Sequence, residues 1–317
     1  MRRPRLLICL LVAGALAAGL YAWLHGARRI PEDVLKARGG AGATASSPGA
    51  PSQPSEISDR FIFQNPYLDG RSAWFRERFA AARAELRSLE PPAEPTISSQ
   101  VHRKPFTAGS WVESLDEEAK RERDEIESNA VESALVFFVP DVEPRELLVY
   151  LAASDYLERI PGEGTIDVET YIPRPAQPPQ GLESLPGLGR NQWLSRVIWK
   201  RSQPLARPTA VFYLNAALRD GELLVLLEEA WRNLGGPGHV PVRMEATQIA
   251  VAARRGGSLV HLMTFYSGQT IPIFTDGIAV RLTEAFHRKV VGLVAAEAKG
   301  WKAPPEAVSF FRSIGID

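Results

Sequence analysis

Cysteine is almost absent from this sequence of 317 residues, which contains only Cys9. A lone cysteine cannot form an intrachain disulfide, and it cannot complete a cysteine-based zinc site. Cys9 also lies inside a long apolar run near the N-terminus, apart from the rest of the chain. The remaining sequence therefore excludes a disulfide framework and thiolate chemistry, whichever redox compartment holds the protein.

An excess of charge of either sign is also missing. The chain has 37 Lys and Arg residues against 37 Asp and Glu residues, so its formal net charge is zero. A neutral chain lacks the electrostatic field that draws a protein to nucleic acid, and we expect no nucleic-acid partner. The apolar fraction of 45% is ordinary for a globular protein, and the length allows one or two domains.

Linear motifs of catalysis and cofactor binding are missing as well. The sequence has no P-loop, no H-E-x-x-H helix and no nucleophile elbow, and no two of its five histidines have metal-ligand spacing. We therefore predict neither a cofactor nor a metal site. A catalytic triad assembled in space needs no linear signature, so a membrane-anchored hydrolase stays as an alternative. It would require Ser258 or Ser267 within hydrogen-bond distance of His261 or His287.

The chain does contain an uncharged apolar run, residues 6–24, which reads LLICLLVAGALAAGLYAWL. As a helix rising about 1.5 Å per residue it would cover about 28 Å, close to the hydrocarbon thickness of a bilayer. Arginines precede it, and Tyr21 and Trp23 stand where interfacial aromatic residues belong. The run predicts a signal anchor over residues 1–29 that attaches the chain to a membrane by a single pass. A protein secreted after signal cleavage is the alternative.

Residues 30–56 follow the apolar run and are rich in Gly, Ala, Ser and Pro. Their central part has no aromatic or large aliphatic residue, so we expect a flexible linker that contributes nothing to a core. A short basic N-terminus before a first apolar segment usually stays in the cytoplasm. We therefore expect the folded part on the other side of the membrane, in the periplasm if the protein is bacterial.

Hydrophobic periodicity divides the rest into a helical region, residues 57–132, and an α+β domain, residues 133–317. In the second region Asp220 is expected to cap a helix, and Gly256-Gly257 to close a hairpin. We expect helices from residue 144, over 223–234 and over 277–299, and strands over 134–139, 165–171, 194–200, 209–214, 242–253, 258–266 and 270–274. Strands joined by hairpins favour a mixed or antiparallel sheet covered by helices, which is an α+β fold.

Two segments have features of binding surfaces. The Pro-rich loop at residues 172–192 favours an extended conformation suited to recognition by another protein. The segment after it contains five basic residues and two tryptophans without an acid between positions 190 and 207. Such a strip can bind phosphates or lipid headgroups, although basic residues also protect edge strands from wrong pairing. The candidate binding residues are Arg190, Trp193, Arg196, Trp199, Lys200, Arg201 and Arg207.

Three functional classes remain open. The preferred hypothesis is a membrane-anchored, non-catalytic module that binds another protein or an anionic component of the cell envelope. The second is the anchored hydrolase. The third is a small-ligand sensor or carrier with a pocket between sheet and helices. A serine–histidine contact would favour the second class, an apolar pocket the third, and an exposed apolar patch near residues 172–207 the first.

Overall fold

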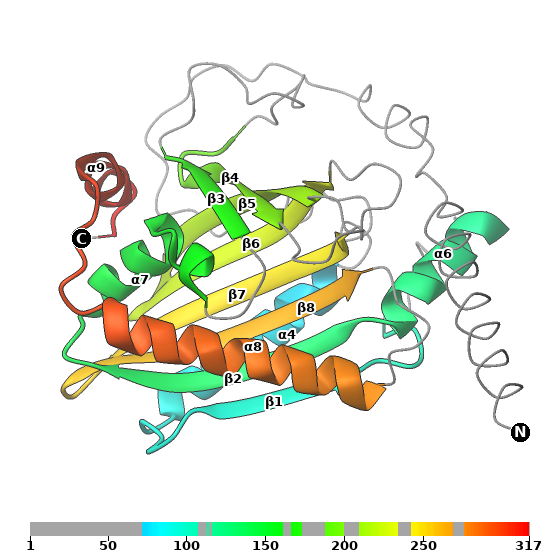
Figure 1. Ribbon diagram of the computed structural model, residues 1–317, viewed down its shortest axis with the longest axis horizontal. Helices are drawn as coiled ribbons and strands as arrows, with labels where there is room; N and C mark the ends of the chain where they lie inside the picture. Colours follow the sequence, from blue (N-terminus) through cyan, green and yellow to red (C-terminus); the bar gives the residue numbers. More distant parts are fainter. Residues whose placement is uncertain are drawn as a thin grey trace, which may run out of the picture. The chain divides into compact units, whose positions relative to one another are not determined.

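The computed structural model describes residues 72–106, 113, 116–160, 166–172, 188–199, 209–233, 242–268 and 276–316. These residues form an eight-stranded sheet with helices on both faces (Figure 1). The strands are β1 (Thr96–Val101), β2 (Val131–Pro140), β3 (Ile166–Tyr171), β4 (Gln192–Trp199), β5 (Thr209–Asp220), β6 (Leu223–Asn233), β7 (Val242–Arg254) and β8 (Gly257–Gly268). The helices are α4 (Ser72–Ser88), α6 (Glu117–Ser128), α7 (Pro144–Ala153), the 3-10 helix η1 (Tyr156–Arg159), α8 (Asp276–Glu297) and α9 (Pro305–Ser313).

Every strand pairing in the sheet is antiparallel, in the order β1-β2-β8-β7-β6-β5-β4-β3. The strands from β3 to β8 therefore form a meander in which each strand pairs with the next along the chain. The earlier strands β1 and β2 are added to its far side, where β2 pairs with β8. The predicted α+β fold is confirmed, and the sheet is antiparallel rather than mixed across the described strands.

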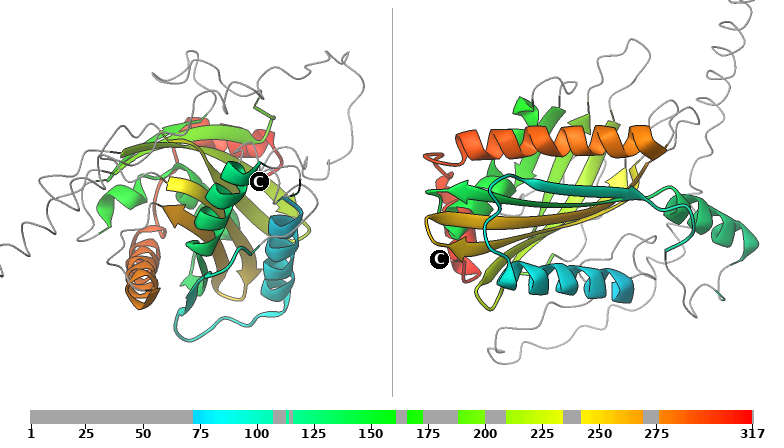
Figure 2. Two further views of the ribbon diagram at one scale, coloured as in Figure 1. Left: turned by 90° about the vertical axis from the view of Figure 1, so that its right-hand side faces the viewer. Right: turned by 90° about the horizontal axis from the view of Figure 1, so that it is seen from below.

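The sheet has two faces that are covered differently. Helices α7 and α8 lie against one of them, which we call the inner face, and α4 lies against the other, the outer face (Figure 2). Because side chains alternate along a strand, neighbouring residues of one strand serve different faces. Each strand thus contributes to two separate layers of packing.

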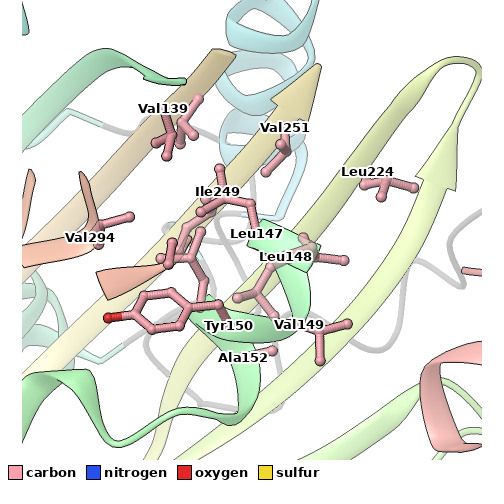
Figure 3. Close-up of a cluster of buried hydrophobic side chains, with 14 of the residues drawn as sticks. Val139, Leu147, Leu148, Val149, Tyr150, Ala152, Leu224, Ile249, Val251 and Val294 are labelled. Carbon is pink, nitrogen blue, oxygen red and sulfur yellow. The ribbon is translucent and has the colours of Figure 1, made fainter. Parts of the chain in front are cut away.

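The main apolar core lies between the inner face and helices α7, α8 and α9. Leu147, Leu148 and Tyr150 of α7 lie in one buried cluster with Ile249 and Val251 of β7 (Figure 3). Val294 of α8 belongs to the same cluster. Its members are almost completely buried, and burial of each aliphatic side chain contributes about 1.5–3 kcal/mol. This core fixes the position of α7 and of the C-terminal half of α8 on the sheet.

Helix α4 is held on the outer face by aromatic packing and by hydrogen bonds. The Phe75 ring lies 5.1 Å, centroid to centroid, from that of Phe265 in β8. The side-chain amide of Gln248 in β7 donates to the Phe79 carbonyl oxygen over 3.1 Å. Arg254 Nη2 donates to the carbonyl oxygen of Leu86 over 2.6 Å, so the guanidinium satisfies one of the unpaired carbonyls at the helix C-terminus.

The predicted hairpin between β7 and β8 is confirmed. Its turn is Arg255-Gly256, and Gly256 has a φ of 83°, a left-handed conformation that favours glycine. Gly257, the first residue of β8, must be glycine for a different reason. A Cβ atom at this position would lie 2.2 Å from the carbonyl oxygen of Val139, so the close approach of β2 requires glycine.

The predicted helix over residues 223–234 is wrong, because this segment is strand β6. Asp220 does not cap a helix but pairs with Leu223 across a two-residue turn, in which Gly221 has a φ of 62°. A glycine at the first central position is typical of a type II′ hairpin turn. Leu223, Leu224, Val225, Leu226 and Leu227 are all buried, because helices cover both faces of the sheet. A continuous apolar run of this kind fits a doubly buried strand and a helix equally well.

Strand β1 lies within residues 57–132, the region predicted to be helical, and the sequence of Thr96–Val101 is too polar to mark it as a strand. It lies at the edge of the sheet and pairs only with β2 among the described strands. The predicted membrane segment at residues 6–24, the linker at 30–56, the strand at 270–274 and most of the Pro-rich loop lie outside the described residues. In the part of the chain that the structure describes, no helix combines the length and apolarity needed to cross a bilayer.

Candidate functional site

A row of polar side chains crosses the inner face of the sheet. Residues opposite each other on antiparallel strands project to the same side, so successive pairs form a line across the sheet. One such line has a polar residue on each strand that it crosses, in the order β1, β2, β8, β7, β6 and β5. This polar row consists of Ser99, Ser133, Thr264, Thr247, Glu228 and Asn215.

The adjacent row, two residues further along each strand, is apolar throughout. It belongs to the core beneath α7 and consists of Ile97, Leu135, Leu262, Ile249, Leu226 and Ala217. The inner face therefore changes from apolar to polar within one row of residues. The polar side faces the end of the sheet where α8 begins, since Arg103, just after β1, pairs with Asp276 at the start of α8.

Hydroxyl groups and a histidine satisfy one another along the first part of the polar row. The hydroxyls of Ser99 and Ser133 lie 2.7 Å apart, as do those of Thr247 and Thr264. His287 of α8 reaches the sheet here, with its Nδ1 2.9 Å from Ser133 Oγ. Burial lowers the pKa of His287 to about 4, so the imidazole is neutral at pH 7. This end of the row carries no charge.

Two carboxylates, Glu228 and Glu245, lie on strands β6 and β7 near the other end of the polar row. Glu228 belongs to the row itself, and Glu245 of β7 lies one row closer to the start of α8, opposite Tyr266 of β8. Burial raises the pKa of Glu228 to about 8, with a further contribution from the charge of Glu245. Burial also raises the pKa of Glu245 to about 7, although a hydrogen bond from Tyr213, with 2.7 Å between the oxygens, opposes the shift.

No cationic side chain among the described residues forms an ion pair with Glu228 or Glu245. Their hydrogen-bond partners are neutral. The Tyr213 hydroxyl donates to Glu245. The Asn215 amide nitrogen donates to Glu228 over 3.3 Å, in the amide orientation in which its oxygen accepts from Ser195. Carboxylates that leave water without a counter-charge destabilise the folded protein. Glu228 and Glu245 are half-buried, and partly buried acids without a counter-charge are candidates for a functional site.

The large apolar side chains that remain exposed among the described residues lie toward this same end. They are Tyr266 at 36%, Ile278 at 37% and Leu282 at 58% exposure. Tyr266 is on β8 beside the polar row, and the other two are in the N-terminal half of α8. The buried side chains of α8, in contrast, all come from its C-terminal half, from His287 onward. The sheet is thus tightly covered over its apolar rows and less so at the polar end.

The serine and histidine residues named for a hydrolase do not meet. The Ser258 hydroxyl donates to the Val142 carbonyl oxygen, and Ser267 has no hydrogen-bond partner among the described residues. His261 lies on the outer face, with Nε2 4.0 Å from Glu85. The Ser133–His287 contact remains, but no carboxylate of the described residues hydrogen-bonds to that imidazole. The constellation of a hydrolase is therefore not assembled among them.

The predicted basic and aromatic strip does not form one surface in the described part of the chain. Trp193 is 1% exposed and packs against Phe310 and Phe311 of α9. The Arg190 guanidinium donates to the Ser313 carbonyl oxygen over 2.6 Å. Arg196 pairs with Glu169 of β3, whose pKa is lowered by hydrogen bonds from Tyr171 and Arg196. Trp199 ends β4, and Lys200, Arg201 and Arg207 lie outside the described residues.

Comparisons with known proteins add similarities of shape only. No protein-family model matches the chain, and no curated protein does. Human STARD10 covers 75% of this chain and 82% of its own, with a TM-score of 0.45 and 9% identity. The match to human StAR-related lipid transfer protein 5 covers 73% of this chain and 97% of that protein, with a TM-score of 0.41 and 10% identity. The match to a STAR-related lipid transfer protein from Xanthomonas axonopodis covers 53% of this chain and 86% of that protein, with a TM-score of 0.39 and 11% identity. TM-scores below 0.5 assign neither family nor activity to the chain.

Proposed function

We propose that this chain is a carrier or sensor that holds a small, partly apolar ligand on the inner face of the sheet. The ligand would lie at the boundary between the apolar rows and the polar row, toward the end of the sheet where α8 begins. The abrupt change from apolar to polar along adjacent rows carries this proposal. Mostly apolar walls with a few convergent polar groups are the usual chemistry of a small-molecule site.

The energetics of the polar row support a ligand rather than a purely structural role. A core that served stability alone would continue its apolar rows to the end of the sheet, since unpaired carboxylates destabilise the fold. Glu228 and Glu245 break this pattern without a counter-charge from the described residues. Proteins usually break such rules at functional sites, where a ligand offsets the loss.

The proposal replaces the interaction module that the sequence favoured. The candidate binding residues of that hypothesis formed the basic and aromatic strip, of which Trp193 belongs to the core and Arg196 is paired within the sheet. The carrier or sensor was the third alternative, and the inner face of the sheet gives it named side chains. A second candidate function has no comparable support in the described residues.

Filling the inner face beside the polar row tests the proposal. Thr264 is half-buried in β8, with its hydroxyl close to that of Thr247. We expect Thr264→Trp to weaken binding of the neutral fluorescent probe N-phenyl-1-naphthylamine about tenfold or more, because the indole would occupy the ligand's place. Fluorescence titration of the full-length protein measures the affinity. Circular dichroism and the melting temperature show whether the variant is folded.

Ser98→Trp is the matched control, because Ser98 is exposed on the edge strand β1 and lies on the opposite face of the sheet from Ser99. It adds the same indole without reaching the inner face, and it should bind the probe as the unmodified protein does. Equal probe affinity in a folded Thr264→Trp protein and in the unmodified protein would refute a ligand site at this position.

We also propose that residues 6–24 anchor the chain in a membrane and that residues 30–56 separate the folded part from it, outside the cytoplasm. The apolar length of the first segment and the composition of the second support this placement. Deleting residues 6–24 should move the protein from carbonate-washed membranes to the soluble fraction, whereas deleting residues 39–56 should not. Release of the intact full-length chain by carbonate would contradict the anchor.

A further inference from the structure

We propose that the ligand carries a cationic nitrogen, a protonated amine or a quaternary ammonium group, which binds between Glu228 and Glu245 beside tyrosine rings. This inference depends on the proposed function, because it names the chemistry of a ligand at that same place. It rests on the strand positions of the two acids, on the neutrality of their partners and on the aromatic groups around them.

The two carboxylates come from adjacent strands and adjacent rows. Glu228 of β6 pairs with Thr247 of β7, and Glu245 precedes Thr247 by two residues on the same face of the sheet. The Cα atoms of diagonal neighbours on adjacent strands lie about 7–8 Å apart. Two carboxylates at such a spacing can both approach one ammonium group, and the charge of Glu245 already acts on Glu228.

Among the described residues, a cation is the group that this arrangement lacks. The hydrogen-bond partners of the two acids, Tyr213 and Asn215, are neutral donors that provide no counter-charge when Glu228 and Glu245 ionise. An anionic ligand would add negative charge beside two acids whose ionisation burial already disfavours. A neutral ligand would offer no counter-charge to their ionised forms, whereas a cation would form charge-assisted contacts with both.

Tyrosine rings provide an independent indication of a cation. Tyr213 of β5 and Tyr266 of β8 lie on the inner face on either side of the acids, and Tyr156 of η1 approaches from the helical layer. The charge of Glu245 contributes to the raised pKa of Tyr213, and the charges of Glu228 and Glu245 contribute to that of Tyr156, after burial in each case. The rings are thus near the acids, and aromatic faces attract ammonium groups.

Four probes with the same eight-carbon tail test the inference: octyltrimethylammonium, octylamine, octan-1-ol and octanoate. Isothermal titration of the full-length protein at pH 8 should show each cation binding about tenfold or more tightly than the alcohol or the acid. The double variant Glu228→Gln/Glu245→Gln should reduce cation affinity to that of octan-1-ol and leave octan-1-ol unchanged. Glu94→Gln, at an exposed position after α4, is the matched control and should change neither.

The outcomes separate the two proposals. Equal affinity for the alcohol, the acid and the cations would leave the carrier function standing and overturn the cationic ligand. Cation affinity that survives the double variant would overturn it as well. If none of the four probes binds, the proposed function fails together with the inference. Tighter binding of octylamine than of octyltrimethylammonium would support the inference and assign the ligand to the protonated amines, and the reverse order to the quaternary ammonium compounds.

Discussion

Replacing Trp193 by alanine should lower the free energy of unfolding by about 3–5 kcal/mol. The indole is almost completely buried, and its ring lies 5.5 Å, centroid to centroid, from the rings of both Phe310 and Phe311. Alanine would leave a cavity between β4 and α9 and would remove both edge-to-face contacts, each contributing about 0.5–1.5 kcal/mol. Urea denaturation followed by circular dichroism measures the change.

Two further variants separate a structural role of this tryptophan from a binding role. Trp193→Phe should recover much of the lost stability, because a smaller aromatic ring still contacts α9. Arg190→Ala should change the free energy of unfolding by less than about 1 kcal/mol, because its hydrogen bond to Ser313 is exposed. Unchanged stability in Trp193→Ala, together with weaker binding to anionic vesicles, would instead return Trp193 to a surface-binding role.

The α+β fold, with its sheet either mixed or antiparallel, could be predicted because its signals are local. Glycines mark the β7–β8 hairpin, and Pro144 marks the start of α7. Strand β6 could not be distinguished from a helix, because its apolar run is buried on both faces by elements distant in the sequence. The one local signal for a turn was Asp220-Gly221, which is typical of hairpins but also places an acid where a helix cap would stand.

The candidate site could not be predicted for the same reason. The predicted helix over residues 223–234 would put Glu228 on a solvated face, together with the acids around it. Once residues 223–233 form a strand, the alternation of Leu224, Leu226 and Glu228 puts a carboxylate on the inner face. Glu245 and Tyr213 join it only through the pairing of β5, β6 and β7, and a sequence alone does not fix strand register. The basic strip is contiguous in sequence and can be read directly from it, whereas the polar row is spread over six strands.

Between pH 7 and pH 9 the protein should lose about 2 kcal/mol of unfolding free energy. Burial raises the pKa values of Glu228 and Glu245, to about 8 and about 7, above the value of 4.5 that glutamate has in the unfolded chain. The folded protein therefore holds protons that the unfolded chain has released. This contribution to stability is complete below about pH 4.5 and is lost as the pH rises through the two folded-state pKa values, about 7 and about 8. Urea denaturation at pH 7, 8 and 9 measures the loss.

The other described groups whose pKa values are shifted titrate outside this range. The lowered pKa of His287 leaves its imidazole neutral in the folded protein above about pH 5, and Tyr213 and Tyr156, whose pKa values are raised, titrate only above it. The double variant Glu228→Gln/Glu245→Gln should remove most of the pH dependence and be more stable than the unmodified protein at pH 9. Glu94→Gln should retain the full dependence. An equal loss of stability in the double variant would show that these two carboxylates are not the cause.

The same pH dependence connects stability with the ligand. A cation bound between Glu228 and Glu245 favours their ionised forms, so it should lower both pKa values and bind more tightly as the pH rises from 7 to 9. Saturating octyltrimethylammonium should therefore stabilise the protein more at pH 9 than at pH 7 and reduce the loss described above. Because this probe has a fixed charge, only groups of the protein can cause the difference. Equal stabilisation at both pH values would place the ligand's charge away from these two acids.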